Sequence, residues 1–147
     1  MNMHNEENYM PTLNQMGYVT KIMDEYSQEF IQRTKGASKA IADLGVGYGF
    51  TSKRLLEQGA QVYANDIDPR HLDVLKNSCG AEERARLHLI PGKLPEAFTP
   101  ETNSLSGVLA SRCFHFLTGE EIGNLVKAMY DGLCPGGLHV WSLKPHT

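Results

Sequence analysis

The sequence predicts an α/β fold built on a doubly wound, mainly parallel sheet. Short apolar runs alternate with amphipathic segments along most of the 147 residues. Strands that alternate with helices in this way form βαβ units, in which the strands are parallel and the helices cover the faces of the sheet. The composition, with 41% hydrophobic and 21% charged residues, is that of an ordinary globular domain, and the length fits one domain.

Four helices are predicted from apolar spacing and capping signals. The first is expected over residues 17–33, where one face carries Val19, Ile22, Met23, Tyr26 and Phe30. The others are expected over residues 50–59, 68–79 and 118–133. Asp68 followed by Pro69 begins the third helix. Thr118 and Glu121 form a capping box on the fourth.

Five strands are expected, over residues 39–45, 60–66, 86–90, 105–112 and 138–144. A loop joins the third strand to the fourth, and a turn over residues 134–137 precedes the fifth. This alternation predicts a Rossmann-like fold. The sequence stops soon after the fifth strand, whose apolar edge includes Val140, Trp141 and Leu143. We expect either a sheet truncated there or an edge covered by a partner, such as a second copy in a homo-oligomer. The alternative is a short strand that twists away.

Composition argues against several classes of protein. The formal net charge of -3 disfavours nucleic acid as a partner, because phosphate binding relies on Lys and Arg. The three cysteines lack the spacing of a zinc site or a disulfide framework, so no metal is expected. The N-terminus is polar and acidic, unlike a signal peptide, and no apolar run reaches the roughly 20 residues that span a membrane. A cytoplasmic protein with no membrane partner is therefore expected.

The stretch "DLGVGYG" over residues 43–49 places three glycines at alternate positions between a strand and a helix. Glycine permits positive φ and close approach of the backbone to a ligand, beside the positive end of the following helix. Phe50 stands where a dinucleotide fingerprint has its third glycine, and the G-K-[ST] ending of a phosphate loop is absent. Asp43 suits ammonium or hydroxyl donors rather than phosphate. We expect a nucleotide-like cofactor without a pyrophosphate, the alternative being a merely tight turn.

A second acidic residue follows the next strand, in the stretch "YANDIDP" over residues 63–69. In open α/β sheets a carboxylate about 20 residues beyond a glycine loop accepts the hydroxyls of a ribose. Asp66 and Asp68 both stand near that position. Asp68 precedes Pro69 and is explained as a helix N-cap. Asp66 is therefore the predicted ribose ligand.

Together, "DLGVGYGF" and "VYANDIDPRHLDVL" resemble the first two motifs of the class I S-adenosylmethionine-dependent methyltransferases. The later "DGLCPGGLHVWSL" resembles the family's turn into its fifth strand, so the resemblance covers roughly residues 39–144. It implies S-adenosyl-L-methionine as the cofactor and methyl transfer as the activity. It also implies that Asp43 holds the methionine ammonium and that Asp66 takes the ribose hydroxyls. The loop backbone would line methionine and ribose, through Gly45, Val46, Gly47, Tyr48 and Gly49.

The adenine and methionine ends follow from the same resemblance. Ile67 would pack on the adenine. Where the family often supplies an acidic residue to the adenine amine, this sequence has Lys93, so a backbone group of Gly92 or Lys93 would serve instead. Ser111 and Arg112 would lie beneath the methionine, with main-chain carbonyls facing its amine.

Methyl transfer from a sulfonium needs alignment of the nucleophile, methyl and sulfur, and a base only if the acceptor must lose a proton. His115, just beyond the fourth strand, is the predicted catalytic base, since its ordinary pKa is near 6.5. The alternative is a histidine packed between Phe114 and Phe116. No N-P-P-[YF] run and no basic stripe marks a nucleobase acceptor, so a small molecule is the predicted acceptor.

Residues 1–38 are predicted to form an N-terminal lid or helical segment over a cofactor-binding core of residues 39–147. The alternative function is a non-catalytic, methyltransferase-like binding module that acts through a partner. A nucleotide-dependent oxidoreductase is a third interpretation, which Phe50 argues against.

Overall fold

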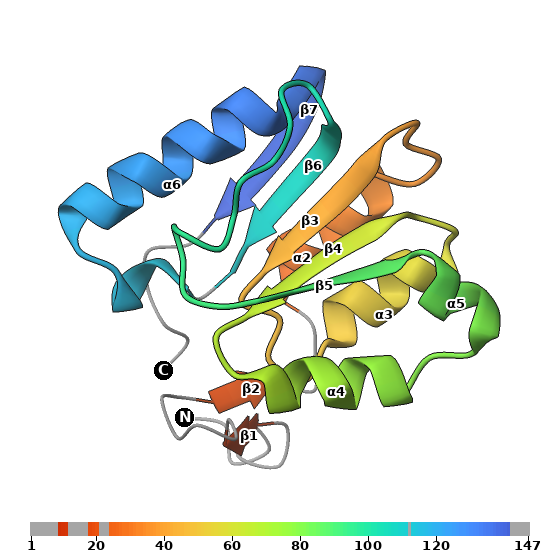
Figure 1. The fold of residues 1–147 in the computed structure, drawn as a ribbon. Helices are drawn as coiled ribbons and strands as arrows, with labels where there is room; N and C mark the ends of the chain where they lie inside the picture. Colours follow the sequence, from red (N-terminus) through yellow and green to blue (C-terminus); the bar gives the residue numbers. More distant parts are fainter. Residues whose placement is uncertain (1–8, 12–17, 21–23, 112, 142–147) are drawn as a thin grey trace.

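The computed structural model describes residues 9–11, 18–20, 24–111 and 113–141. A five-stranded, all-parallel sheet runs through it in the order β5-β4-β3-β6-β7 (Figure 1). The strands are β3 (Ala40–Leu44), β4 (Val62–Asp66), β5 (Leu87–Pro91), β6 (Leu105–Ala110) and β7 (Leu133–Trp141). This order confirms the predicted doubly wound, Rossmann-like class. From β3, the strands that follow early in the chain are added on one side and the later strands on the other. The boundary between β3 and β6 is therefore the switch point at which such sheets bind ligands.

Helices cover both faces of the sheet (Figure 1). They are α2 (Glu25–Arg33), α3 (Phe50–Glu57), α4 (Pro69–Asn77), α5 (Ala81–Ala85), the 3-10 turn η1 (Phe114–Phe116) and α6 (Gly119–Gly132). The helices predicted over residues 50–59, 68–79 and 118–133 are confirmed as α3, α4 and α6. The capping residues Asp68 and Thr118 accept from backbone N–H groups as expected. The short α5 and η1 were not predicted, because so few residues show no apolar period. No helix among the described residues is long and apolar enough to cross a membrane.

Alternate residues of β3 face two separate hydrophobic clusters. Ile41 packs with apolar side chains of α2, α3 and α4 on one face of the sheet. Ala42 and Leu44 pack on the other face, with Leu125 and Met129 of α6. This period of two is what a strand requires when it is covered on both sides. The carboxyl ends of the strands are thereby held between two rigid helical layers.

The segment that joins β5 to β6 contains no regular element, as predicted for residues 91–104. It takes the place of a crossover helix on the α6 face, where Leu94 and Phe98 are buried at 6% and 3% exposure. Two anchors of this kind are enough to hold the loop against the sheet, so the chain passes back to the switch point without a helix.

The predicted first helix is wrong over its N-terminal part. Residues Tyr18–Thr20 form strand β2, which pairs antiparallel with β1 (Tyr9–Pro11). Aromatic and β-branched residues favour this extended backbone. Asp24 then begins α2, because its backbone is extended and its Oδ1 accepts from the Ser27 N–H at 2.8 Å. Residues 21–23 lie outside the described part, and the assignment of residues 1–38 as a lid stays a prediction.

The predicted turn at residues 134–137 is incorporated into β7 instead. The register shifts between the pairs Leu105–Leu133 and Gly107–Leu138, so these four residues form an irregular insertion in the strand. β7 is an edge strand, and Trp141 stacks on Phe114 with ring centroids 5.1 Å apart. That contact covers part of the apolar edge from within the chain. Leu143 lies outside the described residues, and the homo-oligomer through this edge stays a prediction.

Replacement of Gly49 by alanine should destabilise the fold by about 2–4 kcal/mol. Gly49 has φ +83°, and a Cβ there would lie 2.8 Å from a Leu75 side-chain carbon on α4. Strain and overpacking therefore add. The control is Gly36→Ala, at φ +76° with nothing within 4 Å, which should cost only about 1 kcal/mol. Urea denaturation measures both, and equal losses would show that helix packing does not require this glycine.

Candidate functional site

The glycine loop between β3 and α3 is a tight cradle at the switch point. Gly45, Gly47 and Gly49 all have left-handed φ, at +73°, +59° and +83°. The N–H groups of Gly45 and Val46 both donate to the Asn65 carbonyl at 2.9 Å, which ties the loop to the end of β4. A Cβ at Gly45 would approach that of Cys113 to 3.1 Å. The glycines are therefore needed by the turn itself, and they also leave backbone bare toward a ligand.

Asp43 is buried beside this loop, with 3% of its surface exposed. Its Oδ2 accepts from the Ser52 hydroxyl at 2.6 Å. Ser52 lies in the first turn of α3, whose N-cap residue Gly49 has no side chain to cap the helix. The backbone N–H of Ser52 also hydrogen-bonds Asp43. Asp43 therefore caps the helix from the preceding strand, where a negative charge faces the positive end of the helix.

Burial raises the pKa of Asp43 from 3.8 to about 6, and the nearby Asp66 carboxylate also raises it, although hydrogen bonds from Ser52 act in the opposite direction. A carboxylate that is costly to ionise gains most from a cationic neighbour. Two buried acidic side chains at one site disfavour a phosphate and favour a ligand that brings an ammonium and hydroxyl donors. This agrees with the charge of the cofactor expected from the sequence.

Asp66 ends β4 and is held by three donors from within the chain. Its Oδ2 accepts from the Gly47 N–H at 2.9 Å, and its Oδ1 accepts from the Asp68 N–H at 2.9 Å. Nδ1 of His71, on α4, lies 2.9 Å from the same Oδ1. A carboxylate offers about four acceptor positions, so one remains, on Oδ2. Two ribose hydroxyls bound to Oδ2 would take this position and replace the Gly47 N–H. Asp68, in contrast, pairs with Arg70 and caps α4, as its alternative role predicted.

The predicted adenine side lies at the ends of β4 and β5. Ile67 is 46% exposed, so its side chain is available for stacking. The Gly92 N–H already donates to the Asp66 carbonyl at 3.0 Å, which removes it as a contact for adenine. The Gly92 carbonyl accepts from the Asn65 side chain at 3.1 Å and keeps one lone pair. Of the backbone groups predicted at Gly92, only this carbonyl can serve.

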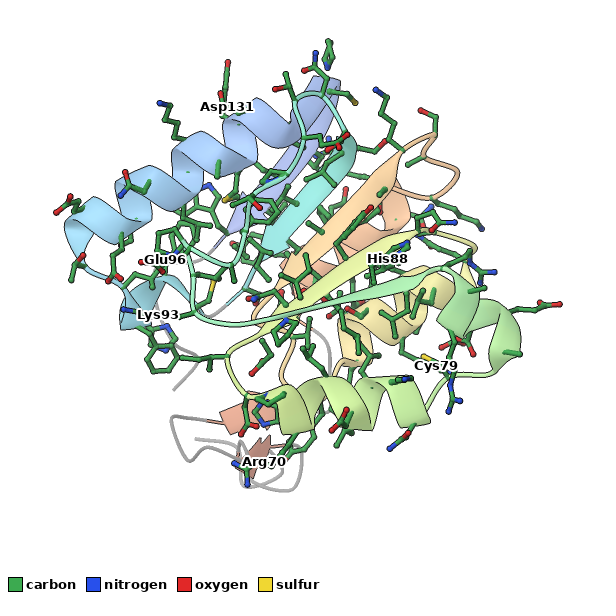
Figure 2. All side chains as sticks on the ribbon, in the orientation of Figure 1. Arg70, Cys79, His88, Lys93, Glu96 and Asp131 are labelled. Carbon is green, nitrogen blue, oxygen red and sulfur yellow. The ribbon has the colours of Figure 1, made fainter. Side chains whose placement is uncertain are left out.

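Lys93, which stands where the family often has an acidic residue, points toward α6. Its Nζ pairs with Glu121 Oε2 at 2.9 Å (Figure 2 shows Lys93 on the loop near the start of α6). Glu121 also accepts from the Thr118 N–H, which completes the capping box. The ion pair therefore fixes the loop after β5 to the helix after β6. It accounts for a cation at this position without any ligand.

The segment after β6 brings Ser111 and Cys113 to the glycine loop. The Ser111 carbonyl lies 3.8 Å from the position of a Cβ at Gly45. Burial raises the pKa of the Cys113 thiol to about 12, so the thiol stays protonated and is not a nucleophile. His115 is exposed, with its ring centroid 4.0 Å from that of Phe116, and is not enclosed between two phenylalanines. Partial burial lowers its pKa. Arg112 lies outside the described residues.

Three buried polar residues of the site were not predicted: Ser52, Asn65 and His71. The sequence pattern around Asn65 and His71 could have indicated that both are buried. Asn65 interrupts an apolar strand next to Asp66, and His71 stands one helical turn after the N-cap of α4, on the face of its apolar residues. No pattern around Ser52 indicates its role, because Asp43 comes close to it only in the folded chain.

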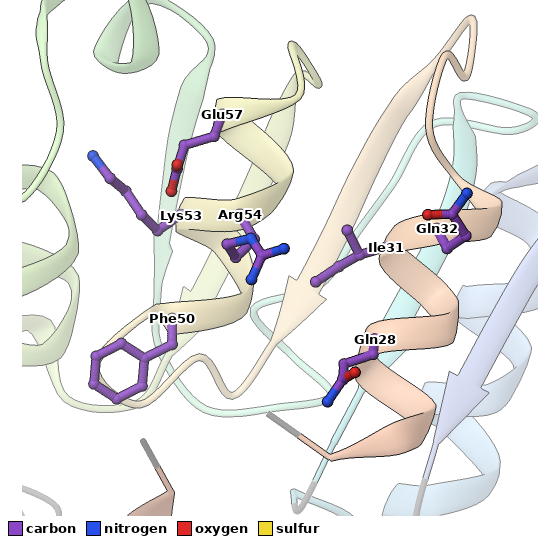
Figure 3. A pocket seen from close by; sticks show the side chains of 7 residues that line it. All are labelled: Gln28, Ile31, Gln32, Phe50, Lys53, Arg54 and Glu57. Atoms are coloured by element: carbon purple, nitrogen blue, oxygen red, sulfur yellow. The ribbon is translucent and has the colours of Figure 1, made fainter. Parts of the chain in front are cut away.

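Two further features of the described residues bear on the site. No three His, Cys, Asp or Glu side chains gather there to hold a metal ion. A groove of about 640 Å³ lies between α2 and α3, lined mainly by polar side chains (Figure 3). Its lining residues include Gln28, Phe50 and Arg54 but neither Asp43 nor Asp66. The groove is therefore separate from the glycine-loop site.

A glycine loop between two acidic strand ends, at the switch point of a parallel sheet, is the arrangement with which open α/β proteins bind nucleotide-like ligands. Residues 41–137 match the methyltransferase domain family. The chain belongs to this family, which confirms the resemblance to class I S-adenosylmethionine-dependent methyltransferases. The family is one of enzymes, and its methyl donor is S-adenosyl-L-methionine.

Individual relatives are distant. A probable ribosomal RNA small subunit methyltransferase A from Methanococcoides burtonii is 30% identical over 86 residues, which are 57% of this chain and 31% of that protein. The glycopeptide N-methyltransferase MtfA has a TM-score of 0.64 at 21% identity, over 79% of this chain and 51% of that one. MtfA has also been solved with S-adenosyl-L-methionine. A TehB-like S-adenosylmethionine-dependent methyltransferase from Corynebacterium glutamicum has a TM-score of 0.65 at 22% identity, over 80% and 62% of the chains. The chain spans about a third of the curated relative, and the solved structures share its fold.

Asp43 should make stability fall as the pH rises from about 4 to about 6. Below pH 4 its carboxyl is protonated in both states. Between the ordinary value of 3.8 and the raised pKa of about 6, the unfolded chain releases the proton first, so ionisation favours unfolding. The unfolding free energy of the native protein minus that of Asp43→Asn should drop by up to about 3 kcal/mol across this window. Denaturant titrations at four pH values measure it, and a difference independent of pH would contradict the assignment.

Proposed function

We propose that this chain binds S-adenosyl-L-methionine at the glycine loop and transfers its methyl group to a small-molecule acceptor. The observation that carries the proposal is the pair of buried carboxylates, Asp43 and Asp66, on either side of that loop. Membership of the methyltransferase domain family supports it. The chain offers one carboxylate for the ammonium of the cofactor and one for its ribose hydroxyls.

The proposed chemistry relies on alignment. When bound, the cofactor supplies a methyl group already activated by a sulfonium; as the acceptor's bond to carbon forms, the S–CH₃ bond breaks and its electron pair stays on sulfur. Asp43 holds the ammonium, and Asp66 orients the ribose. Ile67 packs on the adenine. With both ends fixed, the methyl group points in one direction, and orientation of this kind supplies much of the rate.

His115 is proposed as the general base for an acceptor that must lose a proton. It follows β6 at the ligand edge of the sheet, in an exposed turn that an acceptor can reach. Its lowered pKa keeps the imidazole neutral, and therefore basic, at neutral pH.

The small-molecule acceptor rests on charge. The net charge of -3 is unfavourable for an RNA phosphate backbone. The name of the curated relative points to ribosomal RNA, which makes RNA the competing acceptor. Methyl-labelled cofactor incubated with the chain and separate small-molecule, RNA and protein fractions of a cell extract distinguishes them. Label in the small-molecule fraction supports the proposal. Label in RNA alone, or binding without transfer to any fraction, contradicts it in favour of an RNA methyltransferase or a binding module.

Asp66→Ala should abolish measurable cofactor binding, a loss of at least about a hundredfold in affinity. Removal of the carboxylate deletes the ribose acceptor and releases the Gly47 N–H and His71 at once. Calorimetric titration with S-adenosyl-L-methionine measures the effect, with NAD as the ligand that should not bind. The matched control is Asp73→Ala, on the exposed face of α4, which should bind like the native chain. Equal affinity of both variants would remove Asp66 from the site.

His115→Ala should lower kcat by about 10²–10⁴ for an acceptor that ionises and leave the affinity for cofactor unchanged. The control is His88→Ala on β5, where His88 stacks on Tyr63 away from the loop (Figure 2). Steady-state kinetics and calorimetry together make the test. A matching loss of cofactor affinity, or an unchanged kcat, would show that His115 is not the base.

A further inference from the structure

α4 brings a buried histidine to the carboxylate that the proposed function assigns to the ribose. His71 is 1% exposed, and its Nδ1 lies 2.9 Å from Oδ1 of Asp66. A carboxylate oxygen accepts a hydrogen bond, so Nδ1 is the ring nitrogen that carries the proton and donates in this contact. The contact spans only five residues of sequence, from the end of β4 to the first turn of α4.

The ring of His71 also contacts the glycine loop. Tyr48 packs against it edge to face, with ring centroids 5.3 Å apart. His71 therefore projects from α4 and contacts both the end of β4, through Asp66, and the glycine loop, through Tyr48. Its own ring faces Asp66 and Tyr48, so it acts on a ligand through these two residues.

The distribution of donors on Asp66 is asymmetric. Among the residues that the structure describes, Oδ1 takes two donors, the Asp68 N–H and His71, whereas Oδ2 takes one, the Gly47 N–H of the loop. Two donors on one oxygen fix the plane of the carboxylate. The other oxygen then faces the loop, where a ligand hydroxyl can exchange with a single amide.

We propose that His71 is a positioning residue for nucleoside recognition: it holds Asp66 in the orientation that accepts the ribose hydroxyls. This inference rests on the proposed function, because it assumes that the ribose binds at Asp66. Its role is separate from that of Asp43, which serves the amino-acid end of the cofactor. Loss of His71 should therefore weaken every ligand that carries the ribose by the same factor.

The experiment compares two ligands and three variants by calorimetry. S-Adenosylhomocysteine carries the ribose and the amino acid, whereas 5′-methylthioadenosine carries the ribose without the amino acid. His71→Leu keeps the apolar bulk of the side chain but removes the hydrogen-bond donor. It should lower the affinity for both ligands about tenfold. His71→Asn places an amide nitrogen on Cγ, as in Nδ1 of histidine, and should restore both affinities to within about threefold of native. Asp43→Asn should weaken S-adenosylhomocysteine only.

Thermal unfolding without ligand establishes that each variant is folded at the titration temperature. If His71→Leu is not folded, His71→Gln, whose amide lies one carbon further out, takes its place with the same expected loss. The proposal is overturned if the donor-free variant binds both ligands like the native chain, if it weakens only S-adenosylhomocysteine, or if His71→Asn loses as much as His71→Leu. A native chain that binds neither ligand overturns the proposed function itself, and the positioning role with it.

Discussion

The buried carboxylate of Asp66 is the interaction on which the geometry of the site depends. It joins the end of β4, the glycine loop and the first turn of α4 through donors from Gly47, Asp68 and His71. A buried charge without such donors would cost several kcal/mol, and the three contacts offset that cost. The loop, the strand and the helix are thus fixed to one point before any ligand arrives. Preorganisation of this kind lowers the cost of ordering on binding.

The second buried carboxylate, Asp43, fixes the start of α3 in a similar way, but its ionisation is unfavourable. Asp43 caps a helix whose own N-cap is Gly49, and that glycine is required because Leu75 of α4 packs against it. The close packing of two helices therefore moves the cap to a neighbouring strand. Burial there raises the pKa of Asp43 to about 6. A buried carboxylate of this kind favours a cation beside it, and the ammonium of the proposed cofactor would be that cation.

Much of the fold was predictable because its signals are local. The glycine loop, the N-cap at Asp68 and the capping box at Thr118 all lie within a few residues of the elements that they begin. The N-terminal helix was overpredicted because helical spacing of apolar residues outweighed the β-forming residues 18–20. Contacts such as Ser52 with Asp43 and Lys93 with Glu121 could not be predicted, because each joins segments that meet only in the folded sheet.

The most direct measurement is a crystal structure of the chain with S-adenosylhomocysteine. The account predicts that the ribose hydroxyls lie within hydrogen-bond distance of the Asp66 carboxylate, with the Gly47 N–H displaced and the His71 contact kept. The amino group should lie toward Asp43. A ligand bound elsewhere, as in the groove between α2 and α3, or a ribose that leaves Asp66 bonded to Gly47, would contradict it.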